Sequence, residues 1–173
     1  KLWIFEFYGI LSVYLRKNNN VFSFFNKKKI ILDGIENIPI NIDLYDILQT
    51  QISKINPDIL IHTAALSNVD ECENYKDNAY KINVSFTENL VKICNKLNIK
   101  MIYISTDHLF SGKNKMLNED SKKEPINYYA KTKDMAEQFI VNFSKSFLII
   151  RTNFYGWGTS YRESFSDKII KNL

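Results

Sequence analysis

Short runs of apolar residues alternate along this chain with longer stretches that have helical spacing, and this alternation restricts the fold more than any other feature of the sequence. The apolar runs are LWIF (residues 2–5), VFSFF (21–25), IPINI (38–42), DILIHTAA (58–65), MIYIS (101–105) and FLIIR (147–151). Strands that are apolar on both faces are typical of a parallel sheet covered by helices on both sides. The sequence therefore predicts an α/β fold with a doubly wound parallel sheet.

Stretches with helical spacing connect these predicted strands. The longest of them places the apolar side chains of residues 79–97 on one face. The other predicted helices are residues 10–17, 44–52, 128–143 and 164–173. No internal repeat or linker composition interrupts the alternation, so residues 1–173 are predicted to form one domain. Because ligands of doubly wound sheets bind beyond the carboxyl ends of the strands, the residues that follow each strand are the candidates for a site.

Composition and charge exclude several classes of function. The net charge of +4 is mild and the basic residues are spread along the chain, so no nucleic-acid face is expected. Cys72 and Cys94 have neither metal-ligand spacing nor a disulfide framework, which favours reduced thiols in a cytoplasmic protein without a metal site. Residues 2–15 are fewer than the ~20 apolar residues of a spanning helix, Glu6 interrupts them, and no cleavage site follows. We therefore expect neither a membrane anchor nor an export signal.

The residues with the clearest chemical meaning follow the fifth predicted strand. Ser105-Thr106-Asp107 ends that strand, and the next predicted helix carries Tyr129 and Lys133, which are four residues apart and so share a face. An ammonium beside a phenol lowers the tyrosine pKa from its usual value of ~10 and makes a proton donor for carbonyl–alcohol interconversion. A chain with ten tyrosines can contain a Tyr-x-x-x-Lys pair by chance, so the position after Ser-Thr-Asp carries the interpretation.

Several longer segments resemble one known family in order and spacing. They are PDILIHTAALSNVDECE, STDHLFSG, PINYYAKTKDMAEQF and LIIRTNFYGWG. Together they are similar to the extended short-chain dehydrogenase/reductase superfamily, and most of all to the dTDP-4-dehydrorhamnose reductase family. The resemblance implies a Rossmann-like fold, a nucleotide-linked 6-deoxysugar as substrate and a place in the synthesis of surface polysaccharide sugars. Members of the family continue beyond this length, so the C-terminal substrate portion is expected to be largely missing, and a homodimer is left open.

The resemblance also implies catalytic and substrate-contacting residues. Thr106 would orient the substrate carbonyl, Tyr129 would give the proton, and Lys133 would hold the nicotinamide ribose and lower the pKa of Tyr129. Thr106 and four further residues are the expected substrate contacts: Asp107, His108, Asn153 and Phe154. His108 stands where reductases of this branch usually have tyrosine. Related dehydratases carry Asp-Glu after the threonine, so the pair Asp107-His108 argues against dehydration.

The same resemblance implies the cofactor contacts. Besides Tyr129 and Lys133, these are Gly9, Ser12, Lys27, Asp43, Leu44, Ala64, Ala65, Asn83 and Ser105. Lysines follow the second strand where a carboxylate would repel a 2′-phosphate, which favours NADPH, with NADH as the alternative. The family's glycine-rich turn falls on Glu6, Gly9 and Ser12, so only the middle glycine is retained. Glu6 adds bulk and a negative charge where phosphates would bind.

Three functions fit these residues. The first is an NADPH-dependent reductase of a 4-keto nucleotide sugar, and the retained set of Thr106, Tyr129 and Lys133 favours it. The second is a non-catalytic regulatory or scaffold relative, such as the regulatory β subunit of methionine adenosyltransferase, and the altered turn at Glu6 favours that reading. The third is a nucleotide-sugar epimerase on the same fold.

Overall fold

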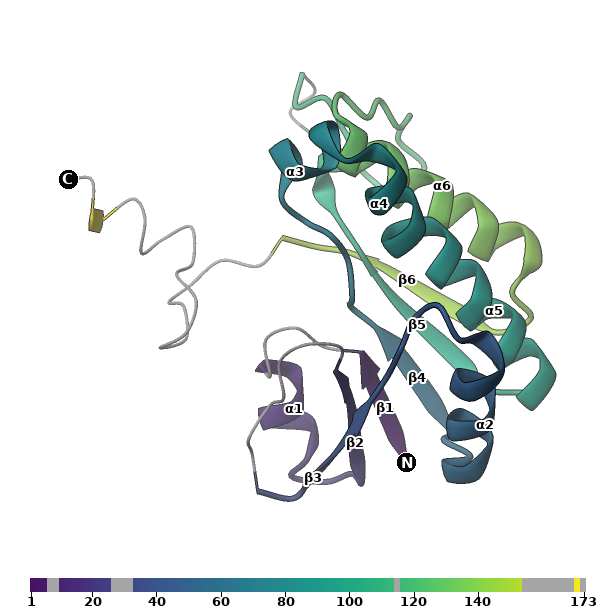
Figure 1. The fold of residues 1–173 in the computed structure, drawn as a ribbon. Helices are drawn as coiled ribbons and strands as arrows, with labels where there is room; N and C mark the ends of the chain where they lie inside the picture. The colour runs from purple at the N-terminus through teal and green to yellow at the C-terminus, as the bar shows by residue number, and fades with distance from the viewer. Residues whose placement is uncertain (6–9, 26–32, 114–115, 154–169, 172–173) are drawn as a thin grey trace.

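The computed structural model describes residues 1–5, 10–25, 33–113, 116–153 and 170–171. Its single sheet has six parallel strands in the order β3-β2-β1-β4-β5-β6 (Figure 1). The strands are β1 (Leu2–Phe5), β2 (Val21–Phe25), β3 (Ile35–Pro39), β4 (Ile59–His62), β5 (Lys100–Ser105) and β6 (Phe147–Arg151). This order confirms the predicted doubly wound sheet and reverses direction between β1 and β4, where such sheets bind ligands.

The helices connect the strands by crossovers on both sides of the sheet. They are α1 (Ile10–Leu15), α2 (Tyr45–Ile55), α3 (Val69–Asn74), α4 (Lys76–Tyr80), α5 (Phe86–Leu97) and α6 (Tyr128–Phe143). A π-helical turn, η1 (Lys81–Ser85), joins α4 to α5, and a 3₁₀ turn, η2 (Asp107–Leu109), follows β5. Figure 1 shows α2, α5 and α6 on one face of the sheet and α1 on the other. Among the described residues, no helix is both long and apolar enough to cross a membrane.

Several predicted boundaries differ from the structure by a few residues, and one predicted helix lies mostly outside the described part. The third strand is residues 35–39 rather than 38–42, because Val21 of β2 pairs with Ile35 and starts the ladder there. This strand lies at the sheet edge, where a polar alternation and Pro39 are tolerated. The helix predicted over residues 79–97 begins at Lys76 and contains the π-helical turn. Of the predicted helix at residues 164–173, only residues 170–171 lie within the described part, and they are helical.

Most of the core lies between the sheet and the face covered by α2, α5 and α6. Its fully buried side chains include Ile52, Leu60, Leu90, Met101 and Ile140. A smaller cluster lies on the α1 side and contains Leu2, Val21 and Ile61. Among the described residues, the larger cluster lies on the α2, α5 and α6 side, and it supports the ends of β4 and β5 where the candidate site residues lie.

Candidate active site

Two helix-capping interactions place the predicted catalytic residues. Thr106 follows β5, is 5% exposed, and accepts a hydrogen bond from the His108 backbone N–H at 3.2 Å, which starts η2. Asn127 caps α6 by accepting from the Ala130 N–H at 2.8 Å. Tyr129 therefore lies in the first turn of α6, where hydrogen bonding to Thr106 acts on its phenol. The structure thus brings the predicted hydroxyl and the predicted proton donor together.

Lys133 is buried beneath this pair. Its Nζ donates to the carbonyl oxygen of Ile104 at 2.8 Å and lies 4.1 Å from the centre of the Tyr103 ring. Burial lowers the pKa of Lys133 to about 7, while Glu137 acts in the opposite direction. An ammonium has three donors. Among the described residues its hydrogen bond goes to Ile104 alone, which leaves donors for a ligand.

The charge state of Tyr129 differs from the expectation. The sequence predicts a pKa lowered by Lys133, whereas burial raises the pKa of Tyr129, Thr106 acts against this, and Asp107 adds to it. The reason is that the Lys133 amine is directed at Ile104 and the Tyr103 ring. Tyr129 is therefore a neutral phenol at physiological pH.

Asn83 connects the cofactor side of the site to the catalytic helix. It is 1% exposed and lies within η1, a π-helical turn of the kind found at functional sites. Its Oδ1 accepts from the Leu66 N–H at 2.7 Å, and its Nδ2 donates to the Leu66 carbonyl at 3.1 Å. Nδ2 also donates to Thr132 Oγ1 at 2.9 Å, and that hydroxyl donates to the Tyr129 carbonyl. One side chain thus holds the loop after β4 against α6.

The other predicted cofactor contacts have varied positions. Ala64 and Ala65 lie half-buried in the loop after β4, and Ser12 is completely buried in α1. A buried small side chain there is what close packing of helix and strand requires. Asp43 and Leu44 are exposed before α2, and Asp43 forms an ion pair with Lys81 of η1 at 2.7 Å. Ser105 is buried at the end of β5. Glu6, Gly9 and Lys27 lie outside the described residues.

The predicted substrate residues gather beyond β5 and β6. Asp107 and His108 are exposed, and His108 lies edge-on to the ring of Tyr129 with the ring centres 5.8 Å apart. Asn153, which follows β6, donates from Nδ2 to Asp107 Oδ2 at 3.3 Å. The last candidate, Phe154, lies outside the described residues. The exposed side of Tyr129 therefore faces polar groups from two strand ends.

A buried ion cluster centred on Glu137 was not predicted from the sequence. This carboxylate is 1% exposed and accepts from Arg151 Nη2 at 2.9 Å and from Lys123 Nζ at 2.7 Å. Lys123 also pairs with Asp134 at 2.8 Å. Burial raises the pKa of Glu137, but hydrogen bonds from Arg151 and Lys123 hold it below its usual value. The signal in the sequence is the spacing of Lys133 and Glu137, which places them on one helix face.

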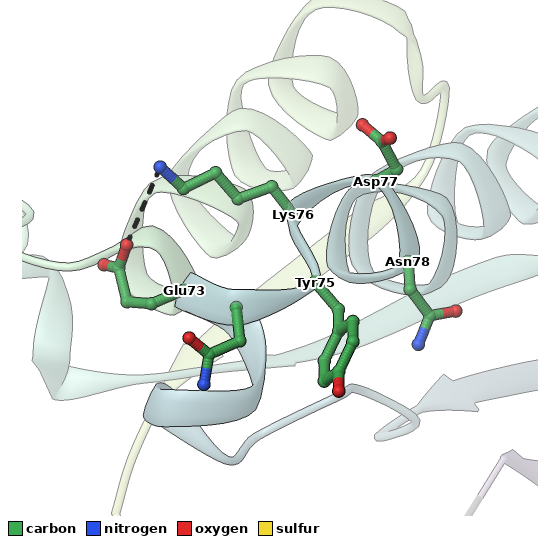
Figure 2. A pocket seen from close by; sticks show the side chains of 6 residues that line it. Glu73, Tyr75, Lys76, Asp77 and Asn78 are labelled. Atoms are coloured by element: carbon green, nitrogen blue, oxygen red, sulfur yellow. Dashed lines mark ion pairs between the residues drawn. The ribbon is translucent and has the colours of Figure 1, made fainter.

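A shallow pocket near the start of α6 is separate from this cluster. It is lined by residues 73–78 of α3 and α4, and Figure 2 shows Tyr75 pointing away from the ion pair between Glu73 and Lys76. Glu73 Oε1 also accepts from the Tyr128 N–H at 2.7 Å. We interpret this region as an anchor for the N-terminus of α6.

Both cysteines lie in the interior of the fold. Cys72 and Cys94 are free and buried, and burial raises their pKa values to about 11 and about 12. The Cys72 thiol donates to the Leu66 carbonyl at 3.2 Å. Within the part of the chain that the structure describes, no group of three or more His, Cys, Asp or Glu side chains could hold a metal ion.

The chain matches a known protein family over most of its length. The family described as RmlD substrate binding domain matches residues 15–172. The chain is 36% identical over 117 residues to the spore coat polysaccharide biosynthesis protein SpsK of Bacillus subtilis (strain 168), covering 66% of the chain and 40% of SpsK. It is 33% identical over 95 residues to methionine adenosyltransferase 2 subunit beta of Bos taurus, covering 55% of the chain and 28% of that protein. The matches therefore span less than half of each relative.

Solved structures with the same fold include two dTDP-4-dehydrorhamnose reductases. A hypothetical one from Sulfolobus tokodaii has a TM-score of 0.78 and 30% identity, covering 91% of this chain and 58% of that one. The one from Bacillus anthracis str. Ames, in complex with NADP, has a TM-score of 0.77 and 27% identity, covering 99% of this chain and 59% of that one.

Proposed function

The chain belongs to the RmlD substrate binding domain family, and from this premise we propose that it is the cofactor-binding part of a sugar-nucleotide oxidoreductase. The finer proposal is reduction, with NADPH, of the 4-keto group of a nucleotide-linked 6-deoxysugar. The observation that carries it is the buried Lys133 beneath the adjacent hydroxyls of Thr106 and Tyr129. Similarity to SpsK supports a role in polysaccharide sugar synthesis, and the two buried free thiols suit a cytoplasmic enzyme.

The described residues fit a nicotinamide cofactor. Lys133 has donors left over after its bond to Ile104, and these suit the hydroxyls of a ribose. Ala64 and Ala65 lie at the carboxyl end of β4, where small side chains let a dinucleotide approach the backbone. The choice of NADPH over NADH rests on the lysines at residues 27–29 and on the NADP bound in the Bacillus anthracis reductase.

The catalytic roles follow from the charge states of the side chains. A bound NADPH would supply the hydride. Tyr129 is a neutral phenol because burial raises its pKa, so it can donate a proton to the oxygen of the carbonyl being reduced. The hydroxyl of Thr106, fixed by the His108 N–H, would hold that oxygen. Lys133 would bind the ribose from beneath, and its ammonium would stabilise the phenolate that Tyr129 becomes when it gives up its proton.

The decisive test replaces Tyr129 by Phe in the intact protein. Loss of the proton donor is expected to lower kcat at least about 100-fold in NADPH oxidation with a dTDP-4-keto-6-deoxysugar, with NADPH affinity unchanged. Tyr128→Phe is the matched control, since Tyr128 is the preceding residue of α6 and its ring lies beneath the Lys76 amine instead. Full turnover by Tyr129→Phe would contradict the catalytic assignment.

A second candidate function is that of a non-catalytic regulatory subunit, which the similarity to methionine adenosyltransferase 2 subunit beta favours. Glu6, at a position where the family resemblance predicts a glycine of the phosphate-binding turn, also favours it. Titration of the chain with NADPH and NADH, followed by fluorescence, separates the two functions. We expect binding of NADPH. Absence of binding at millimolar concentration of either dinucleotide would favour the regulatory function.

A further inference from the structure

The loop after β4 is tied at both of its ends to one continuous helical segment. At its start, His62, the last residue of β4, has its Nε2 2.9 Å from Oγ1 of Thr87 in α5. At its far end, the backbone N–H and C=O of Leu66 both bond to the side chain of Asn83 in η1. Residues 63–65 form the span between these two attachments, and they include the two alanines that face the proposed dinucleotide.

A hydroxyl joins the two attachments to each other. Thr87 Oγ1 donates to the carbonyl oxygen of Asn83 at 2.8 Å. A hydroxyl has one proton and a carbonyl only accepts, so the contact with His62 requires that Thr87 accept and that Nε2 donate. Burial lowers the pKa of His62, and its ring is therefore the neutral tautomer with the proton on Nε2. The residues His62, Thr87, Asn83 and Leu66 close a ring with the loop, and we call this ring the loop clamp.

The loop clamp lies in the interior of the fold. His62, Thr87 and Asn83 are at most 1% exposed. The His62 ring lies edge-on to Phe86, with the ring centres 5.4 Å apart, and its centre is also 5.4 Å from that of Tyr103 on β5. A buried polar group costs free energy unless it is hydrogen-bonded, and an apolar side chain carries no such cost. Packing between these rings alone therefore does not call for a histidine, whereas the bond to Thr87 does.

We propose that His62 is a positioning residue which, through Thr87, fixes the backbone of residues 63–65 in the conformation that receives a dinucleotide. Holding both ends of a short loop on one helical segment removes much of the loop's conformational freedom. A loop ordered in advance lowers the entropy cost of binding, so the clamp increases affinity without touching the ligand. The inference rests on the proposed function for the identity of that ligand.

Three threonine variants test the clamp. Thr87→Val removes the hydroxyl with little change in shape, and so it breaks the bonds to His62 and to the Asn83 carbonyl. Thr87→Ser keeps the hydroxyl and should recover what Thr87→Val loses. Thr50→Val is the matched control, because Thr50 Oγ1 makes the same kind of bond to the carbonyl of Asp46, four residues earlier, on the exposed side of α2.

The first measurement is hydrogen exchange of the Leu66 amide, which lies at the opposite end of the loop from the altered bond. Thr87→Val is expected to speed this exchange about 10-fold, and Thr87→Ser and Thr50→Val to change it less than about twofold. The amide of Met101, which bonds to the Ser146 carbonyl on the other side of β5, is the reference for overall stability. Unchanged Leu66 exchange in Thr87→Val, or an equal rise at Met101, would overturn the proposal.

The second measurement is the ¹⁵N spectrum of the His62 ring, which reports the tautomer directly. The proton is expected on Nε2 in the unmodified chain, and a proton on Nδ1 would overturn the proposal because Thr87 could then not accept. His62→Gln places an amide donor near the position of Nε2 and should keep the slow exchange of Leu66. His62→Met has no donor and should lose it, and equal exchange in these two variants would count against the clamp.

Binding of NADPH, measured by fluorescence, separates this inference from the proposed function. Thr87→Val is expected to weaken binding about 10-fold, Thr87→Ser to recover most of the affinity, and Thr50→Val to match the unmodified chain. If the unmodified chain binds no NADPH but Leu66 responds to Thr87→Val, the proposed function fails and the hold of the clamp on the loop stands. If NADPH binds equally well to the unmodified chain and to Thr87→Val, only the role of His62 fails.

Discussion

At the scale of single residues, Lys133 opposes the folding of the domain that contains it. Its pKa of about 7 in the folded chain lies below the ~10.4 of an exposed lysine. Between these two pH values the unfolded chain binds more protons than the folded chain, so the contribution of Lys133 to stability rises with pH. Below about pH 7 the full penalty of burying the amine is present.

Lys133→Met should therefore change the pH dependence of stability. Between pH 7 and pH 9 the unmodified chain is expected to gain about 2 kcal/mol in free energy of unfolding as Lys133 loses its proton. The Lys133→Met variant has no such proton to lose, so it should lack this gain. Urea denaturation at the two pH values measures this difference. Lys131→Met, an exposed neighbour on α6, is the control and should show no such trend. Parallel stability curves for Lys133→Met and the unmodified chain would contradict the lowered pKa.

The sequence predicted which residues meet at the site better than it predicted their charge. Tyr129 and Lys133 could be paired from helical spacing, and Thr106 could be placed by its strand end. The pKa of Tyr129 could not be derived in the same way, because it depends on burial by chain segments that are distant in sequence. Glu137 was missed for the same reason, since its partners come from β6 and a loop.

At the scale of elements, the helical segment from Lys76 to Leu97 has two structural roles. Its α5 part packs Leu90 and Ile93 into the core. Its π-helical turn presents Asn83 to the loop after β4 and to α6. Apolar periodicity predicted the first role, but it could not reveal the wider turn, because a single turn of five residues is too short for its spacing to distinguish a π-helix from an α-helix.

Asn83→Ala should loosen the loop after β4. The substitution leaves the Leu66 N–H without its partner and the Leu66 carbonyl with only the Cys72 thiol as donor, and an unpaired buried polar group costs ~1–3 kcal/mol. We expect the free energy of unfolding to fall by about 2 kcal/mol and the Leu66 amide to exchange faster with solvent. Asn95→Ala is the control on α5, where Asn95 bonds to Phe143 and Lys145 at the other end of the helix. Equal Leu66 exchange in both variants would contradict the role of Asn83.

At the scale of the whole molecule, the described residues bury more apolar side chains on the α2, α5 and α6 face of the sheet than on the α1 face. The strand order and fold class could be predicted from the alternation of apolar runs and helices, because parallel strands need crossover helices. The edge strand β3 was placed three residues late, because its polar residues hide the strand pattern that central strands show clearly. Packing density also could not be read from the sequence, since Leu60 and Leu148 belong to equally apolar runs.

These two leucines should respond differently to the same substitution. Replacing Leu60, which is fully buried in β4, by Ala should lower the free energy of unfolding by about 2–5 kcal/mol. Replacing Leu148, which is 45% exposed on β6, by Ala should lower the free energy of unfolding by less than about 1 kcal/mol, because water already covers much of this side chain. Urea denaturation of both variants measures the difference. A similar loss in the two variants would show that the β6 face is covered as fully as the core.

The contacts of Asn83 also bear on the order in which the domain is assembled during synthesis. Asn83 bonds to Leu66, 17 residues earlier, and to Thr132, 49 residues later. A nascent chain leaves the ribosome from its N-terminus, so the first four strands emerge well before Thr132 does. The loop after β4 can thus be fully secured only when α6 has emerged and docked. A chain arrested before residue 132 would form much of the sheet yet lack the bond from Asn83 to α6, so capture of the proposed dinucleotide would report that α6 has emerged and docked.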